Sequence, residues 1–334
     1  SKSVNAFPFH PDAILRMKKH NPHTFAILGA MELCEHEKIP YSILPEGEAT
    51  EETLASYDLL ILPEVYIVSD PLADLLKSYT EKGGKLLISG KTGLWEPDFS
   101  VRKEFALSEL MGVSYRSIHT EYSQNDWSAY LKKCDDASYE GMLEKTTPPV
   151  SEFFLETVCT SAHPEFHFVL PCVACAPDQW VNWWSPPPGK ETSYPALTVN
   201  TYGKGTVFYA AFDFFTMAAR ETYRQVPELF HQIYKKLDVV PLIQNVTDIP
   251  NILRTAYFET KDAYYVHQIS TLAHEYKGDT APVSGGKLVL HTPIRSAKLV
   301  YPKTQELSVS QDGENYIVEL PAVVLQQFIV LEKE

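Results

Sequence analysis

The alternation of apolar and polar residues is most regular between residues 57 and 90. Four consecutive apolar residues, Leu59 to Leu62, predict a strand that is buried on both faces. Apolar residues at positions 72, 75, 76 and 79 then share one helix face, which Ser69 or Asp70 can cap and Gly83-Gly84 ends. A second apolar run, "KLLIS", follows. The stretch therefore predicts a strand–helix–strand unit with a right-handed parallel crossover.

The neighbouring segments extend this unit into a larger domain. Residues 24–38 favour a helix, and the apolar stretch "IPYSILP" at 39–45 favours a further strand. "YPALTVNTYGKGTVFYAAF" predicts a hairpin around Gly203-Lys204-Gly205, and a helix carrying Leu229, Phe230, Ile233 and Leu237 on one side follows it. We therefore expect residues 1–240 to form an open, mostly parallel α/β sheet of the flavodoxin type with helices on both faces. Residues 117–165 are an insertion whose pattern predicts no clear structure.

The pattern changes after Pro241. Residues 250–334 contain short strand-like runs separated by turns, and Asp312-Gly313 is a strong hairpin signal. Several short strands with frequent turns are typical of a small antiparallel sandwich. We therefore expect a second domain, a C-terminal β-sandwich, over 250–334.

Composition excludes some classes of function. The net charge of −14 disfavours nucleic acid, whose phosphates attract basic surfaces. No apolar stretch approaches the roughly 20 residues of a membrane span, so no membrane association is expected. The first residues show no secretory signal pattern, which favours the cytoplasm.

The cysteines give no clear chemical signal. Five is an odd number, which disfavours a disulfide framework. Cys172 and Cys175 form a lone C-x-x-C, whereas a structural zinc site needs four ligands. We interpret them as core thiols, with a redox or metal role as the alternative, and expect neither a metal nor a cofactor.

The string Ser-Gly-Lys-Thr-Gly at 89–93 looks like a phosphate-binding loop. That motif requires glycine at position 85, where Lys85 stands, and the intervening "KLLIS" predicts a strand rather than a cradle of free N–H groups. The bend could instead present Ser89 or Thr92 as a nucleophile, but no histidine with an acidic partner accompanies either residue at a telling spacing. We predict no catalytic residue in this chain.

Four residues are candidates for contacts with a sugar or with another subunit. Glu64 follows the buried strand, at the sheet edge where α/β folds bind ligands, although a loop carboxylate that pairs locally is the alternative. Trp183 and Trp184 belong to a rigid Trp- and Pro-rich loop that could stack on sugar faces or pack against another domain or subunit. Trp95 completes the set of candidates.

Two stretches resemble a known protein family. "YDLLILPEVYIVSDPLADLLKSYTEKGGKLLISGKTG" and "YPALTVNTYGKGTVFYAAF" are similar to the class I glutamine-amidotransferase-like domain of glycoside hydrolases, above all the β-galactosidase trimerisation domain. The strands "YYVHQIS" and "QQFIVLE" resemble the C-terminal β domain of the same enzymes. The likeness covers most of the chain except about 115–165, and it concerns architecture rather than catalysis.

The resemblance implies a function and also limits it. A working amidotransferase of this fold carries a cysteine where this chain has Gly90-Lys91-Thr92-Gly93, and the partner histidine is missing too. In the glycoside hydrolases, the catalytic carboxylates lie on a (β/α)₈ barrel that precedes this region, and no barrel fits before residue 57. The chain is then either a fragment of a longer enzyme or a relative that lost its barrel.

The resemblance therefore implies a non-catalytic accessory and oligomerisation region of a β-galactosidase- or α-fucosidase-like enzyme. Its expected partners are a carbohydrate, a (β/α)₈ barrel in the same or another chain, and further copies of itself. Two alternatives stay open. One is a free-standing hydrolase or amidotransferase-like enzyme with a non-standard site. The other is a carbohydrate-binding module.

Overall fold

The computed structural model of this chain describes residues 22–122, 127–150, 153–172, 186–220, 223–247, 252–271 and 281–334. The chain divides into two compact units, and each is described by itself. The α/β unit comprises Ser1–Ala30 and Ile43–Val239, and the β unit comprises Met31–Ser42 and Val240–Glu334.

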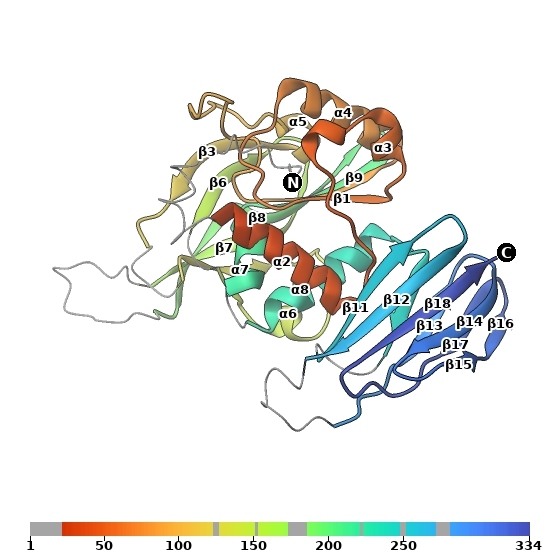
Figure 1. Cartoon of the computed structure of the whole chain (residues 1–334). Coiled ribbons are helices and arrows are strands. Elements are labelled where there is room, and N and C mark those ends of the chain that lie inside the picture. The colour runs from red at the N-terminus through yellow and green to blue at the C-terminus, as the bar shows by residue number, and fades with distance from the viewer. Residues whose placement is uncertain are drawn as a thin grey trace. The chain divides into compact units, whose positions relative to one another are not determined.

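A seven-stranded mixed sheet forms the centre of the α/β unit (Figure 1). Its strand order is β1-β2-β9-β8-β7-β4-β5. Neighbouring strands are parallel among β1, β2 and β9, and antiparallel across the rest of the sheet. The strands are β1 (Leu59–Leu62), β2 (Lys85–Ser89), β4 (Ala129–Lys133), β5 (Pro149–Val150), β7 (His163–Pro171), β8 (Pro188–Tyr202) and β9 (Gly205–Ala210).

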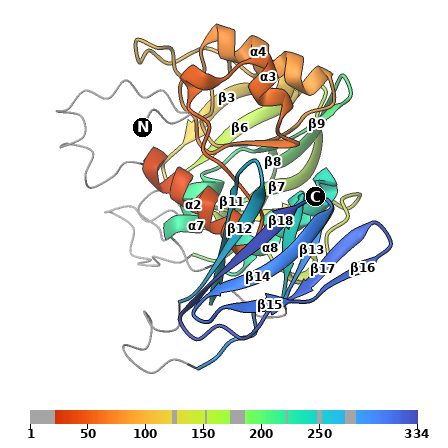
Figure 2. The same cartoon turned by 45° about the vertical axis from the view of Figure 1, so that its right-hand side comes forward.

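Helices lie on both sides of this sheet, with α3 and α4 on one face and α7 and α8 on the other (Figures 1 and 2). This layering confirms an α/β fold with helices on both faces, whereas parallel pairing is confined to β1, β2 and β9 and the other four strand pairs are antiparallel. The helices are α2 (Pro22–His36), α3 (Glu51–Ala55), α4 (Asp70–Glu81), α5 (Ser108–Met111), α6 (Met142–Lys145), α7 (Phe214–Arg220) and α8 (Gln225–Leu237), with a 3₁₀ turn, η1, at Glu46–Glu48.

The strand–helix–strand unit predicted from the sequence is confirmed. Helix α4 connects the parallel strands β1 and β2. The expected burial of β1 on both faces is wrong, because β1 is an edge strand and only its Leu62 is buried. The Ser69 hydroxyl caps the helix by accepting a hydrogen bond from the Leu72 amide over 3.4 Å. Leu72, Leu76 and Tyr79 are buried, as their spacing predicts.

The predicted hairpin and the helix after it are also confirmed. Strands β8 and β9 pair in antiparallel register up to Tyr202 and Gly205, which leaves Gly203 and Lys204 as the two-residue turn. Gly203 has a φ of +59°, a conformation that suits glycine in such turns. All four apolar residues predicted for one side of α8 are buried.

Two features of the α/β unit differ from the sequence expectations. The strand predicted at 39–45 is wrong, because this segment pairs with no other strand, and the side chains of Tyr41 and Ile43 are exposed. The 117–165 region, which predicted no clear structure, contributes β4 and β5 to the main sheet. A separate antiparallel pair joins β3 (Val113–His119), which ends inside this region, to β6 (Phe154–Cys159), which lies within it.

The β unit consists mainly of two antiparallel sheets with strand orders β10-β13-β17-β16 and β11-β12-β18-β14-β15. Apolar side chains from both sheets form a single buried cluster, which includes Leu288 and Val318 from the first sheet and Val266 and Ile329 from the second. The strands are β10 (Ile243–Val246), β11 (Leu253–Glu259), β12 (Ala263–Ser270), β13 (Lys287–Leu290), β14 (Ile294–Tyr301), β15 (Gln305–Leu307), β16 (Val309–Asp312), β17 (Asn315–Glu319) and β18 (Gln326–Lys333).

The hairpin expected at Asp312-Gly313 forms between β16 and β17. Asp312 is the last paired residue of β16 and faces Asn315, so Gly313 and Glu314 make the turn. Gly313 has a φ of +61°, which the hairpin turn requires.

Candidate functional site

The carboxyl ends of β1, β2 and β9 carry an unusual set of buried polar groups. Glu64 lies two residues beyond β1, is fully buried, and has a φ of +47°, a conformation rare for a residue with a side chain. The bend after β2 contains Gly90, where an added Cβ would lie 2.7 Å from the Cγ of Glu64. Glycine at 90 therefore permits the close approach of these two segments.

Hydrogen bonds from three directions hold the Glu64 carboxyl group. Ser89 Oγ donates to Oε1 over 2.7 Å, and the Phe215 amide at the start of α7 donates to the same oxygen over 3.3 Å. Thr216 Oγ1 donates to Oε2 over 2.9 Å. Burial raises the pKa of Glu64 to about 8, and the charge of nearby Asp213 acts in the same direction. Below that pH, Glu64 is therefore an uncharged acid.

Thr92 closes the bend that carries Lys91. Its Oγ1 donates to the Ser89 carbonyl over 2.6 Å and accepts from the Val65 amide over 3.0 Å, so it links the ends of β1 and β2. Ser89 and Thr92, the two possible nucleophiles, are both fully buried, and their hydroxyls serve these structural bonds. No histidine among the described residues hydrogen-bonds either hydroxyl.

The ammonium group of Lys91 lies among aromatic rings. Its Nζ is 4.0 Å from the centroid of the Phe153 ring, 5.9 Å from that of Tyr66 and 5.8 Å from that of Trp95. Within the part of the chain that the structure describes, Nζ makes no hydrogen bond or ion pair. Burial lowers the pKa of Lys91, against the opposing charges of Asp213 and Glu64.

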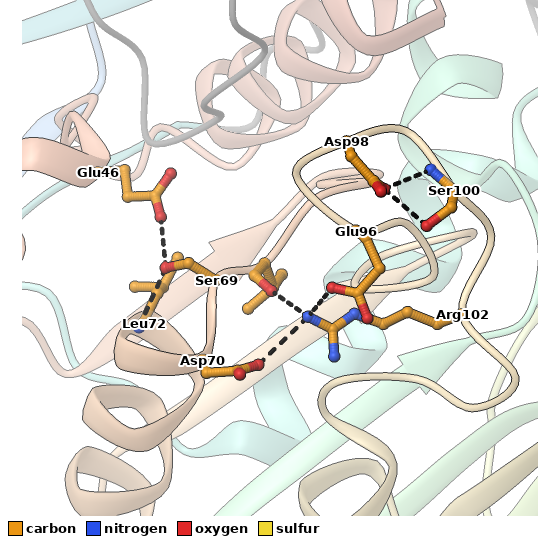
Figure 3. Close-up of polar contacts among 9 residues, drawn as sticks. Glu46, Ser69, Asp70, Leu72, Glu96, Asp98, Ser100 and Arg102 are labelled. Atoms are coloured by element: carbon orange, nitrogen blue, oxygen red, sulfur yellow. Dashed lines mark hydrogen bonds and ion pairs between the residues drawn. The ribbon is translucent and has the colours of Figure 1, made fainter.

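The loop that follows Trp95 is anchored by Arg102, whose polar contacts are drawn in Figure 3. The Arg102 guanidinium donates to Asp70 Oδ1 over 3.2 Å at the start of α4, and to the Val68 carbonyl over 3.5 Å. It also pairs with Glu96 Oε2 at 2.8 Å. Trp95 is partly exposed, and its ring centroid lies 5.1 Å from that of Tyr66.

Further polar contacts in Figure 3 fix the same region. Asp98 Oδ1 accepts from the Ser100 amide over 2.9 Å and from the Ser100 hydroxyl over 2.6 Å, which closes the tip of the loop. Glu46 Oε1 accepts from Ser69 Oγ over 3.0 Å. Arg102 thus links the loop to the start of α4.

The structure brings two of the four predicted contact residues to this edge. Glu64 precedes Tyr66 by two residues, and the Trp95 ring contacts the Tyr66 ring. The contacts of Glu64 fit the alternative in which its carboxyl group pairs with nearby protein groups. A role of Glu64 in sugar binding stays a prediction. Trp183 and Trp184 lie outside the described residues. Sequence reasoning missed Lys91, Phe153 and Thr216, although a lysine between glycines after a buried strand was a visible signal for the first.

Burial raises the pKa of Cys34, Cys134 and Cys159, which disfavours the reactive thiolate at these three described cysteines. Burial raises the pKa of Cys34 to about 12 and that of Cys134 to about 11, although Cys134 Sγ lies 3.2 Å from His167 Nδ1. Burial lowers the pKa of His167, so this contact joins a neutral thiol and a neutral ring. Cys172 is exposed because β7 ends one residue before it, so its interpretation as a core thiol is wrong; Cys175 lies outside the described residues.

Two further findings bear on the class of site. Among the described residues, no group of three or more His, Cys, Asp and Glu side chains could hold a metal ion. No described helix is both long and apolar enough to cross a membrane.

Comparison with known proteins agrees with this architecture. Residues 48–151 match the model of the β-galactosidase trimerisation domain family. The β-galactosidase BgaH of Haloferax lucentense is 29% identical over 90 residues, which are 27% of this chain and 14% of that protein. The match lies in one part of the chain and in a small part of the relative.

Solved structures extend the likeness in fold over nearly the whole chain. α-L-Fucosidase isoenzyme 2 from Paenibacillus thiaminolyticus superposes with a TM-score of 0.72 at 16% identity, covering 92% of this chain and 45% of its own. Gan42B, a GH42 β-galactosidase from G. stearothermophilus, superposes with a TM-score of 0.60 at 14% identity, covering 94% and 37%. The chain thus has the fold of a region that spans less than half of each of these proteins.

Proposed function

We propose that this chain is a non-catalytic accessory and oligomerisation region of a glycoside hydrolase of the β-galactosidase or α-fucosidase kind. The observation that carries the proposal is the match of residues 48–151 to the trimerisation domain family. The shared fold with a fucosidase and a β-galactosidase over more than 90% of the chain supports it. The class I amidotransferase-like origin of the α/β unit belongs to the same proposal.

The residue chemistry of the described segments supports the non-catalytic part. At the sheet edge, the hydroxyls of Ser89 and Thr92 are engaged in bonds that join β1 to β2. Two acids lie near this edge, Glu64 and Asp213, but both are buried, and protein donors hold the Glu64 carboxyl group. Glycoside hydrolysis ordinarily needs two carboxyl groups that flank the scissile bond. A (β/α)₈ barrel, in the same or another chain, would supply the catalytic pair.

The role in oligomerisation is tested by measuring the mass of the particle in solution. Size-exclusion chromatography with multi-angle light scattering, over a hundredfold range of concentration, should give an assembly of several chains, and three is the expected number. A particle of one chain at every concentration would contradict this role.

The non-catalytic role is tested with the purified chain alone. Nitrophenyl β-galactoside and α-fucoside should both remain intact, because no carboxylate pair is expected in the chain. Turnover of either substrate would overturn the assignment and favour the alternative of a hydrolase with its own site.

We further propose that Trp95 contributes to a sugar-contacting surface, because its ring is partly exposed beside Tyr66 and its loop is held rigidly by Arg102. Galactose and fucose should each change the tryptophan fluorescence of the chain, and Trp95→Ala should abolish the change. Trp127→Phe is the matched control, because Trp127 Nε1 is already bonded to the Pro186 carbonyl. A response that persists in Trp95→Ala would remove Trp95 from the site.

A further inference from the structure

One short loop carries the exposed apolar surface of the region that matches the trimerisation domain family. Of the described residues within 48–151, the large apolar side chains that are mainly open to solvent are Phe99 and Val101, which are 50% and 57% exposed. Pro97 is exposed beside them. Apolar side chains that gather at one exposed place, unlike single scattered ones, mark contact surfaces.

The backbone of this loop is ordered as a tight hairpin. Trp95 and Val101 form an antiparallel bridge. The Glu96 amide donates to the Ser100 carbonyl over 2.9 Å, and Asp98 accepts from Ser100 at the tip (Figure 3). A loop that is already ordered loses little conformational entropy when it binds, so its exposed side chains can contribute fully to a contact.

Phe99 has a backbone conformation that is unusual for an aromatic residue. Its φ is +67°, in the left-handed region, and its amide donates to the Glu96 carbonyl over 2.9 Å, which fixes the turn. Glycine or asparagine would take this conformation with less strain. A strained residue that holds a half-exposed ring at a loop tip points to a role for the ring beyond the folding of the loop.

The charge distribution favours a second copy of this chain as the partner. The net charge of −14 makes copies of the chain repel each other. Residues 96–103 are neutral, because Glu96 and Asp98 are balanced by Arg102 and Lys103. Two copies can therefore approach at this apolar loop without that repulsion. An anchor that packs on a different surface of the next copy gives a heterologous contact, which can close as a ring.

We propose that Phe99 and Val101 anchor the contact between copies of this chain. The proposal rests on the oligomerisation role proposed above and names the residues that make the contact. Large aromatic side chains that become buried at the centre of an interface carry much of its binding energy. Loss of the Phe99 ring should therefore weaken the assembly more than the loss of an exposed ring elsewhere.

Phe99→Asn tests the anchor without weakening the loop. Because asparagine tolerates a positive φ better than phenylalanine, urea unfolding should show the same or a higher stability. Subunit exchange is followed by mixing full-length chains labelled with donor and acceptor fluorophores. Interface substitutions act mainly on dissociation, so exchange should become at least about tenfold faster in Phe99→Asn. The particle mass should also fall at a lower dilution than in the unaltered chain.

Phe258→Thr is the matched control. Phe258 is 58% exposed on β11, outside the matched region, and threonine suits a strand. This variant should exchange at the rate of the unaltered chain. An unchanged rate in folded Phe99→Asn, which is also the result if a protein of another kind covers the loop, or an equal acceleration in both variants would overturn the proposal. A one-chain particle from the unaltered protein would instead contradict the oligomerisation role itself, and this contact with it.

Discussion

The hydroxyl of Ser89 and the carboxyl group of Glu64 lie 2.7 Å apart, although 25 residues separate them in the chain. The same hydroxyl oxygen accepts from the Glu64 amide over 3.2 Å, so one side chain at the end of β2 holds both the backbone and the side chain that follow β1. This double contact fixes the positive-φ conformation of Glu64. It also explains why residue 90 is glycine, because a Cβ at that position would lie 2.7 Å from the Cγ of Glu64.

Replacement of Gly90 tests that close approach. Gly90→Ala should lower the free energy of unfolding by about 2–4 kcal/mol, because it adds a strained positive φ to a contact of 2.7 Å with Glu64 Cγ. Gly313 has a similar φ of +61° but nothing within 4 Å, so Gly313→Ala should cost only about 1 kcal/mol. Gly47→Ala, with neither feature, should change stability by less than about 0.5 kcal/mol. Urea unfolding of the three variants measures the series, and equal losses at 90 and 313 would contradict the contact.

The raised pKa of Glu64 makes stability depend on pH. The unfolded carboxyl group loses its proton near pH 4.5 and the folded one near 8, so between these values the folded state binds more protons. Stability contributed by this group is therefore highest below pH 4.5 and falls as the pH rises to 8, by an upper bound of about 5 kcal/mol.

Glu64→Gln should remove this loss of stability. The amide keeps an oxygen that can accept from Ser89 and an NH₂ group that can face Thr216, and it carries no charge at any pH. Chemical unfolding at pH 5 and pH 8 should show a smaller difference in the variant than in the unaltered chain. Glu51→Gln is the control, because hydrogen bonding and pairing with Lys82 lower the pKa of Glu51, so the alkaline loss should persist in that variant. An unchanged difference in Glu64→Gln would contradict an uncharged Glu64.

The sequence predicted the parts of the fold in which local pattern and tertiary role agree. The periodicity of helix α4 and strand β2 predicts their burial, and Gly203 marks the turn of the β8–β9 hairpin. Strand β1 forms where predicted, but at the sheet edge only its Leu62 is buried. The segment at 39–45 has an apolar composition but no neighbouring strand to pair with. Whether an apolar run joins a sheet depends on distant partners, and the pattern does not contain them.

The candidate site was predictable only in its location. The rule that ligands bind at the carboxyl ends of parallel strands leads to Glu64 from the sequence alone. The surroundings of Lys91 were not predictable, because Phe153 lies 62 positions away in a region whose pattern predicted no clear structure. An isolated lysine at a turn suggests a solvated side chain, and only the folded chain shows the rings around it.

His119 should change stability with pH in the same direction as Glu64, because both pKa values are raised in the folded chain. Its Nδ1 lies 2.6 Å from Glu121 Oε1 and its Nε2 lies 3.1 Å from Glu156 Oε2, so only the doubly protonated ring can donate to both carboxylates. Burial lowers its pKa, but the hydrogen bonds and charges of Glu121 and Glu156 outweigh burial and raise it above 6.5. The contribution of this group is complete below pH 6.5 and is lost as the pH rises through the raised pKa. Because the ring is partly exposed, the effect should stay below about 1 kcal/mol.

NMR titration of the imidazole protons measures the His119 pKa directly. Glu156→Gln should lower this pKa by removing one of the two charges, and the ring should keep its contact with Glu121. Glu191→Gln, which removes a carboxylate paired with Lys132 instead, is the matched control and should leave the titration unchanged. A titration of His119 that is the same in both variants would contradict the bridging contact.

A buried polar network in the β unit offers the sharpest test of stability there. Gln268 is fully buried, and its Nε2 donates to Asn245 Oδ1 over 3.0 Å and to the Gly285 carbonyl over 2.9 Å. Its Oε1 accepts from Gln327 Nε2 over 2.6 Å.

Gln268→Leu leaves these buried partners short of hydrogen bonds, so the free energy of unfolding should fall by about 2–4 kcal/mol. Gln305→Leu, at an exposed position of edge strand β15, should change it by less than about 0.5 kcal/mol. Since the network joins β10, β12 and β18, hydrogen exchange in Gln268→Leu should accelerate at all three strands. Exchange that accelerates at β12 alone would show that the network does not hold the two sheets together.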